Sequence, residues 1–163
     1  MYPCPCGWLN DPQKACGVAP AVLTKYQKRI SGPLLDRIDI HMEVPRVDYD
    51  KLSGDRMRET SEAIRKRVQA ARGIQQQRFA GSQPDIICNA DMRVGEIRQF
   101  CKLQDEGQSL MRAAMSQLNL SARAYHPILK LSRTIADLAG CDEIQSAHLA
   151  KVLQYRPKIM KGW

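Results

Sequence analysis

Residues 31–45 constrain the local fold more than any other part of this chain of 163 residues. A Gly-Pro pair opens the segment and Pro45 closes it, and such residues mark the ends of regular elements. Between these ends apolar side chains alternate with polar ones, and the apolar positions are Ile38, Ile40, Met42 and Val44. This period of two predicts a half-buried strand over residues 38–45. Arg37 is then expected at the junction between a short helix and that strand.

Arg37 is the first candidate functional residue, and Asp36 and Asp39 flank it. A guanidinium is always charged and carries five donors in a planar fork, so it suits a phosphate on another molecule. Spacing alone leaves a second interpretation open, in which Arg37 only forms an ion pair with one of the two neighbouring carboxylates.

The composition is that of an ordinary globular protein, with 44% hydrophobic and 26% charged residues. Lys and Arg number 25 against 17 Asp and Glu, a net charge of +8 that permits nucleic-acid binding without proving it. An aromatic content of 6% argues against a base-stacking surface. No apolar run is long enough for a bilayer and no signal peptide is recognisable, so we expect a cytoplasmic protein.

Three cysteines, Cys4, Cys6 and Cys16, lie in a segment rich in Pro and Gly. Thiols at such spacing in a reducing compartment indicate a metal knuckle, and zinc is the metal expected. Structural zinc prefers four ligands, so free thiols remain the alternative. Three further cysteines lie near apolar residues and are interpreted as small core residues: Cys88, Cys101 and Cys141.

Two helices are predicted in the first half of the chain. The first begins near Ala19-Pro20 and ends before Gly32-Pro33. The second covers residues 55–79 and is strongly basic, and a loop over residues 80–90 follows it. Its charges form either a solvated face or a DNA-contacting face, and the residues proposed for DNA are Arg65, Lys66 and Arg72.

Four more helices are predicted, over residues 91–101, 106–118, 121–139 and 144–155, and they form a bundle with short connections. Ser121 is a suitable N-cap for the third, and Gly140 follows it as the left-handed C′ residue. Arg133 and Asp137 stand four residues apart on that helix and predict an ion pair.

Two motifs carry a resemblance to a known family. They are Ser-Gly-Pro-Leu-Leu-Asp-Arg-Ile-Asp at residues 31–39, and Leu-Ser-Ala-Arg-Ala-Tyr-His at 120–126 with Ser-Arg-Thr-Ile-Ala-Asp-Leu at 132–138. Both resemble the magnesium-chelatase-like branch of the AAA+ ATPases, in particular the YifB/ComM competence-protein family. The first motif is also similar to the Arg-Phe-Asp finger of the minichromosome-maintenance helicases.

The resemblance implies roles for individual residues. Arg37 matches the arginine finger, which enters the ATP site of the neighbouring subunit and stabilises the transferring phosphoryl group. Arg123 matches the sensor-2 arginine at the start of a lid helix, where free amides also favour an anion. Two positions depart from the family pattern: Val18 stands where a fourth cysteine is usual, and Tyr2 stands where the sensor-1 Asn is usual.

The expected fold is mainly α with a small α/β part, the tail of an AAA+ core followed by a helical-bundle lid. Residues 1–54 would be the core tail, 55–90 a basic connecting helix and loop, and 91–163 the lid. The sequence has neither a Walker A nor a Walker B motif, so we expect part of a longer protein that is inactive alone.

The resemblance implies that the intact protein uses ATP and Mg²⁺, forms a homo-oligomeric ring, a hexamer by family analogy, and moves on DNA, as in branch migration during competence and recombination. Two rival interpretations remain. One is a motor subunit of a metal-insertion complex of the magnesium-chelatase type. The other is a non-enzymatic module that binds zinc and DNA.

Overall fold

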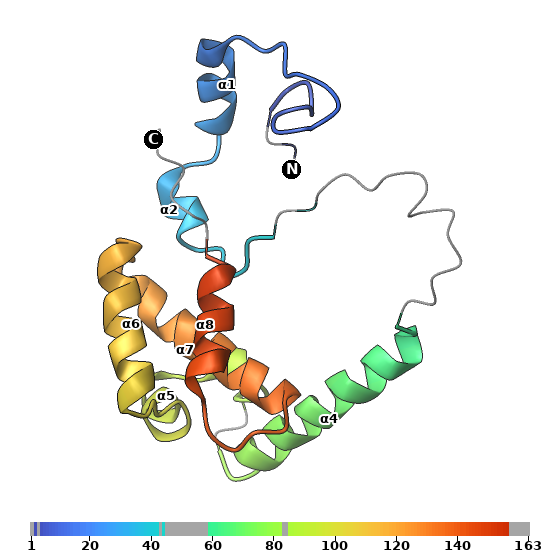
Figure 1. Cartoon of the computed structure of the whole chain (residues 1–163). Helices are drawn as coiled ribbons and strands as arrows, with labels where there is room; N and C mark the ends of the chain where they lie inside the picture. The colour runs from blue at the N-terminus through green and yellow to red at the C-terminus, as the bar shows by residue number, and fades with distance from the viewer. Residues whose placement is uncertain (1, 3, 43, 45–58, 83–84, 157–163) are drawn as a thin grey trace. The chain divides into compact units, whose positions relative to one another are not determined.

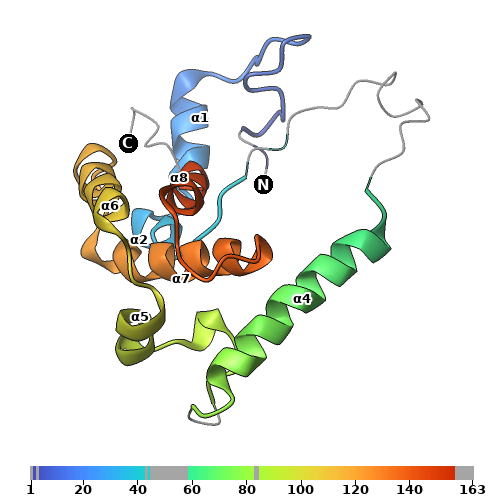
Figure 2. The same ribbon diagram turned by 60° about the horizontal axis from the view of Figure 1, so that its bottom comes forward.

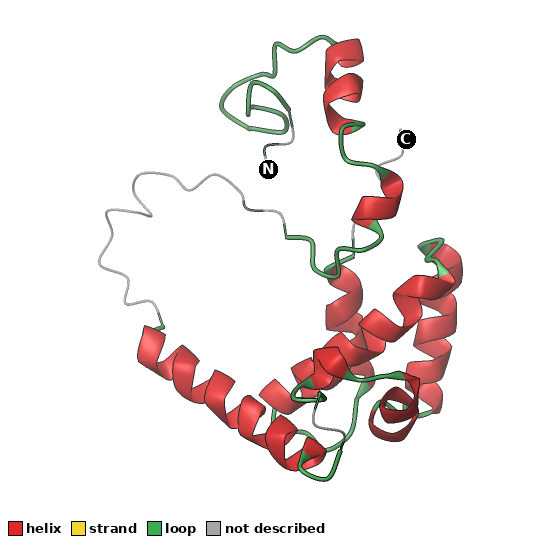
Figure 3. Ribbon diagram, turned by 180° about the vertical axis from the view of Figure 1, so that it is seen from behind, coloured by secondary structure: helices red, strands yellow, loops and turns green. Residues whose placement is uncertain are grey.

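The computed structural model describes residues 2, 4–42, 44, 59–82 and 85–156, and these residues are mostly helical (Figures 1 and 3). The expectation of a mainly α fold is therefore confirmed. The helices in chain order are α1 (Pro20–Gln27), α2 (Gly32–Leu35), α4 (Ser61–Phe79), the 3-10 turn η1 (Asn89–Asp91), α5 (Val94–Phe100), α6 (Asp105–Gln117), α7 (Ala122–Leu138) and α8 (Ser146–Gln154). Within the described ranges no helix is long and apolar enough to cross a membrane.

The chain divides into two compact units. Residues 1–38 and 43–55 form the amino-terminal unit, and residues 39–42 and 56–163 form the carboxy-terminal unit. The division of the chain at residues 54 and 90 expected from the sequence stays a prediction.

The strand predicted over residues 38–45 is wrong for the residues that can be judged, because 38–42 and 44 have no regular structure. Alternating side chains form a strand only beside a second strand, and residues 39–42 contact a helix instead. The N–H of His41 donates to the carbonyl of Tyr155 at 2.8 Å, just beyond α8. Asp39 lies 3.5 Å from the buried guanidinium of Arg156.

Helix α7 is the centre of the carboxy-terminal unit, and it packs against α4, η1, α5 and α8 (Figure 2). Its inner face buries Ile128 and Leu129 in one apolar cluster with Leu149 and Val152 of α8. Burying a side chain of this size contributes about 1.5–3 kcal/mol. This cluster therefore supplies much of the free energy that holds the bundle together.

Cysteines of the carboxy-terminal unit differ in their exposure. Cys101 belongs to the apolar cluster, and burial raises the pKa of its thiol to about 11. Its interpretation as a core residue is confirmed. Cys141 is partly buried and packs against the same cluster, whereas Cys88 is partly exposed and does not belong to it.

The ends of α7 follow the local chemistry of the sequence. Ser121 is the N-cap residue as predicted. Gly140 has a φ of +68°, and its N–H donates to the carbonyl of Asp137, so it ends the helix in the left-handed conformation that glycine tolerates. Pro127 lies inside the helix, which nevertheless runs from Ala122 to Leu138.

Asp137 forms the polar centre of the carboxy-terminal unit. Its side chain is fully buried and accepts four hydrogen bonds, the number that a carboxylate can accommodate. Arg78 of α4 donates two, at 2.5 and 2.8 Å, Asn89 of η1 donates one at 2.7 Å, and Arg133 donates one at 3.0 Å. The predicted ion pair of Arg133 and Asp137 is confirmed. The donors from α4 and η1 occupy the remaining acceptor positions of the carboxylate.

These donors set the protonation of the carboxylate. Burial alone would raise the pKa of Asp137, but hydrogen bonds from Arg78 and Asn89 and the charges of Arg78 and Arg133 lower it below the ordinary 3.8. A carboxylate whose pKa is lowered on folding stabilises the native state above its unfolded pKa. That stabilisation is lost as the pH falls from about 3.8 towards the folded pKa.

We expect Asp137→Asn to lower the free energy of unfolding by about 3–5 kcal/mol at neutral pH, because two buried guanidinium groups lose their counter-charge. The difference from the wild type should shrink as the pH falls below about 3.8. Urea denaturation at several pH values measures both effects. The matched control is Glu62→Gln, which removes an exposed ion pair to Lys66 and should change stability by less than about 1 kcal/mol. Equal losses in the two variants would contradict the prediction.

Candidate functional site

Arg37 lies in the turn that follows α2 in the amino-terminal unit. The helix has four residues and begins at a Gly-Pro pair, where the fixed φ of proline suits the first turn. The N–H of Arg37 donates to the carbonyl of Leu34 at 3.1 Å, which fixes its backbone. Its side chain is exposed, and it has no hydrogen-bond or ion-pair partner within the described part of the chain.

Arg123 is the second residue of α7 in the carboxy-terminal unit. The next residue, Ala124, is buried at 1% exposure and fastens this end of the helix to the bundle. The guanidinium is exposed and likewise lacks a partner among the residues that can be described. Unsatisfied amides of the first helical turn and the helix dipole add to its positive potential. The arrangement can bind an anion that approaches from solvent.

A cavity lies beside the start of α7 that was not predicted from the sequence. Tyr125 and His126 line it. Three cations also line it: Arg98 of α5, Arg112 of α6, and Lys102 between these helices. The three cations are far apart in the sequence and belong to no motif. Only the packing of α5 against α7 and of α6 against α8 brings them to one cavity.

The structure separates the basic residues of α4 into two groups. Arg78 lies at the buried end of the helix and belongs to the Asp137 network. Residues 61–70 are all exposed, so Arg65 and Lys66 face solvent, and Arg72 is exposed as well. Lys66 lies 2.9 Å from Glu62, a contact in which both side chains are about three-quarters exposed.

Arg65 and Arg72 are seven residues apart and thus share one side of α4. The amino-terminal half of this helix extends beyond the bundle (Figure 1). This half can therefore contact a large molecule without disturbing the core.

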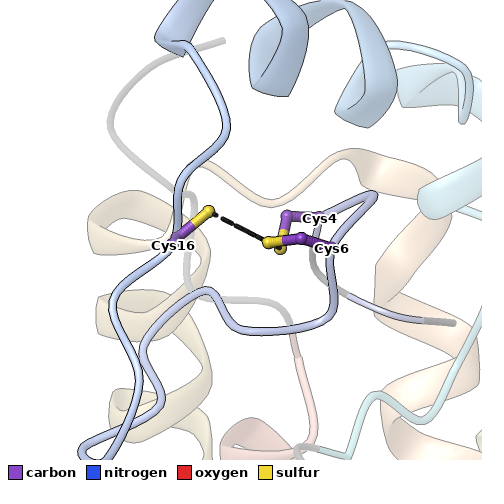
Figure 4. Close-up of side chains that lie close together, drawn as sticks. All are labelled: Cys4, Cys6 and Cys16. Carbon is purple, nitrogen blue, oxygen red and sulfur yellow. Dashed lines mark hydrogen bonds between the residues drawn. The ribbon is translucent and has the colours of Figure 1, made fainter.

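Cys4, Cys6 and Cys16 lie together in the loop before α1 (Figure 4). The Sγ atoms of Cys4 and Cys6 are 3.3 Å apart, those of Cys6 and Cys16 are 3.4 Å apart, and those of Cys4 and Cys16 are 3.8 Å apart. Burial would raise the pKa of Cys4, but hydrogen bonds from the Cys6 thiol and from backbone amides hold it at about 7.

The candidate residues do not form one site. Arg37 and the three cysteines lie in the amino-terminal unit, and Arg123 and the exposed cations of α4 lie in the carboxy-terminal unit. Each group lies within one unit, so each is assessed by its own surroundings.

Comparison with known sequences identifies relatives for both units. Residues 58–156 match the family described as the C-terminal region of magnesium chelatase subunit ChlI, and residues 1–52 match the family described as magnesium chelatase subunit ChlI. The two matches together cover most of the chain, and they agree with the helical bundle found in the carboxy-terminal unit.

Individual relatives match nearly the whole chain. The competence protein ComM of Haemophilus influenzae is 41% identical over 161 residues, which are 98% of this chain and 30% of that protein. YifB of Escherichia coli is 37% identical over 157 residues, which are 96% of this chain and 29% of that protein. YifB of Salmonella typhimurium is 34% identical over 157 residues. The chain therefore spans less than a third of the length of these relatives.

Two arginines on α7 provide a direct test of which residues are structural. We expect Arg123→Ala to change the free energy of unfolding by less than about 0.5 kcal/mol, because the side chain is exposed and unpaired. Arg133→Ala should cost about 3 kcal/mol, because Asp137 loses a buried donor and the carbonyls of Cys141 and Asp142 lose theirs. Urea denaturation of both variants measures the difference. A large loss in Arg123→Ala would show that this residue serves the fold.

Proposed function

Because the chain belongs to the magnesium chelatase family and is similar to its ComM and YifB members, we propose that it is the carboxy-terminal part of a ring-forming AAA+ ATPase that moves along DNA. The observation that carries this proposal is the match of 98% of the chain to the competence protein ComM. The exposed arginines at positions 37 and 123 support it.

Arg37 is the proposed arginine finger. A finger has to leave its own subunit and reach a phosphate on the next one, so it needs an exposed guanidinium on a fixed backbone. Arg37 meets both requirements, since its N–H is bonded within the turn after α2 and its side chain is unpaired among the described residues. Its charge would stabilise the negative charge that develops on the transferring γ-phosphoryl group.

Arg123 is the proposed sensor-2 arginine. It is fixed to the bundle through α7, whose inner face is buried along its length. A contact between Arg123 and the γ-phosphate would therefore couple the presence of ATP to the position of the whole carboxy-terminal unit. Loss of that phosphate would release the unit, a population shift driven by differential binding.

The sequence has no phosphate-cradling glycine motif, so we propose that ATP and Mg²⁺ are held by other segments of the intact protein. Bound there, Mg²⁺ would offset the negative charge of the phosphates. The residues described here would supply only the two arginines. Isolated, this chain should not hydrolyse ATP.

The exposed half of α4 is the proposed DNA contact. Arg65 and Arg72 share one side of the helix, and Lys66 lies next to Arg65. Cations at such positions bind the phosphate backbone without reading sequence, as expected for a motor that moves along DNA.

The matched family names also favour a second function. Both describe magnesium chelatase subunits, so the same finger and sensor could drive a metal-insertion complex. Stimulation of the ATPase by DNA would favour the first proposal. Indifference to DNA would favour the second.

We expect Arg37→Ala in the intact protein to reduce ATP turnover by roughly 10³–10⁵-fold while ATP binding is nearly unchanged. Mixing the variant with wild-type subunits should depress turnover more than in proportion, because each variant disables the neighbouring ATP site. Arg37→Lys should not restore activity, since an ammonium lacks the planar fork. The matched control is Arg29→Ala, an exposed arginine of the same unit whose guanidinium lies over the ring of Tyr26. Unchanged turnover in Arg37→Ala would exclude the finger role.

We expect combined alanine substitution of Arg65, Lys66 and Arg72 to weaken DNA binding by the intact protein equally for all sequences. The slope of log affinity against log salt concentration should fall by about 2–3, because each lost phosphate contact removes nearly one unit. Fluorescence anisotropy at several salt concentrations measures this slope. The control is the triple alanine variant of Arg98, Lys102 and Arg112, which removes the same charge elsewhere. An equal effect in the control would contradict a specific role for α4.

A further inference from the structure

The amino-terminal unit has almost no hydrophobic interior of its own. Among its described residues Cys4 alone is buried, with 0% exposure. Helices α1 and α2 bury no residue. A segment with so little apolar burial generally requires a cross-link or a metal ion to hold one conformation. The single buried side chain is a thiol with two further thiols beside it.

The loop around these thiols is shaped to bring them together. Gly7 has a φ of +78°, and its N–H donates to the carbonyl of Cys4 at 3.1 Å, so the chain reverses directly after Cys6. Asn10 also has a positive φ, of 63°, which turns the chain a second time. The side chain of Asp11 accepts from the N–H groups of Gln13 and Lys14 at 2.8 and 3.2 Å. These turns return the chain to Cys16.

Backbone amides point at the sulfur atoms. The N–H of Leu9 donates to Cys4 Sγ at 3.3 Å, and the backbone of Cys6 also bonds to Cys4. The backbone of Val18 bonds to Cys16. The amides of Cys6 and Val18 each belong to the residue two positions after the cysteine that they contact. Amides directed at sulfur in this way fix the positions of the cysteine side chains in the loop.

The spacing of the sulfur atoms suits a small tetrahedral ion. A zinc–sulfur bond of about 2.3 Å and a tetrahedral angle place two bound sulfurs roughly 3.8 Å apart. The three distances among Cys4, Cys6 and Cys16 run from 3.3 to 3.8 Å, so the thiols need to move by only a few tenths of an ångström. A disulfide requires about 2.05 Å and would join only two of the three.

We propose that Cys4, Cys6 and Cys16 bind one zinc ion as three thiolates, with the fourth coordination position open to a ligand from outside this cluster. The ion would replace the missing apolar core of the loop before α1 and fix its conformation. Among the described residues the cluster consists of these three cysteines, which leaves the fourth position available to a water molecule or to a donor from another part of the protein. Zinc binding by these cysteines can be measured without ATP turnover or DNA binding.

The test is the metal content and cobalt spectrum of the intact chain, purified under reducing conditions. We expect about one zinc per chain by elemental analysis. Replacement by Co²⁺ should give sulfur-to-cobalt charge-transfer bands and the intense visible bands of tetrahedral coordination. Each of Cys4→Ser, Cys6→Ser and Cys16→Ser should weaken Co²⁺ binding by at least about tenfold. The matched control, Cys141→Ser, removes a partly exposed thiol of the other unit and should bind Co²⁺ normally.

Alkylation of the thiols gives a second measurement that does not depend on the folding of the variants. Zinc should protect three of the six cysteines from alkylation, and a strong chelator should abolish that protection. Peptide mapping should identify the protected residues as Cys4, Cys6 and Cys16. The proposal is overturned by a chain without zinc or a cobalt spectrum, by equal effects of Cys141→Ser and the cluster variants, or by a disulfide that accounts for the protection.

Discussion

The buried carboxylate of Asp137 is the interaction on which the carboxy-terminal unit depends. It accepts hydrogen bonds from α4, from η1 and from its own helix, so a single group fixes the positions of α4 and η1 against α7. Arg133 extends the network to the loop before α8 through the carbonyls of Cys141 and Asp142. Such a centre is stable only when complete, because each missing donor would leave a charge buried without compensation. The apolar cluster supplies most of the burial, and this network selects one arrangement of the helices.

The two units use different means of stabilisation. The carboxy-terminal unit has a continuous apolar cluster around α7. Within the described residues of the amino-terminal unit only Cys4 is buried, and its conformation depends on tight turns and on three neighbouring thiols. The proposed finger, Arg37, thus lies in the unit with the smaller interior. If the intact protein is a ring ATPase, contacts with other segments or subunits would supply the burial that this unit lacks.

The arginines of this chain separate by their surroundings. Arg78 and Arg133 bond to buried carboxylate or carbonyl oxygens, so their charges are used by the fold. Arg37 and Arg123 are exposed and have no partner among the described residues. An unpaired, exposed guanidinium at a fixed backbone position remains available to a phosphate from another molecule. This contrast supports the assignment of functional roles to the second pair only.

The sequence by itself determined the local features. The sequence pattern predicted α5 to α8 to within a few residues and the end of α4 at Phe79. Gly140 was identified as the C′ residue of α7, and spacing predicted the pair of Arg133 and Asp137. The tertiary structure alone decided what depends on contacts between distant segments. Residues 38–42 have a strand pattern but form no strand, because hydrogen bonds to a neighbouring strand, and not alternation, make a β-sheet. Arg78 and Asn89 donate hydrogen bonds to Asp137 although both are distant from it in the sequence. No local sequence pattern predicts either contact. Helix bounds and caps depend on residues that are neighbours in the sequence. The burial of a side chain and its long-range hydrogen bonds depend on how the helices pack.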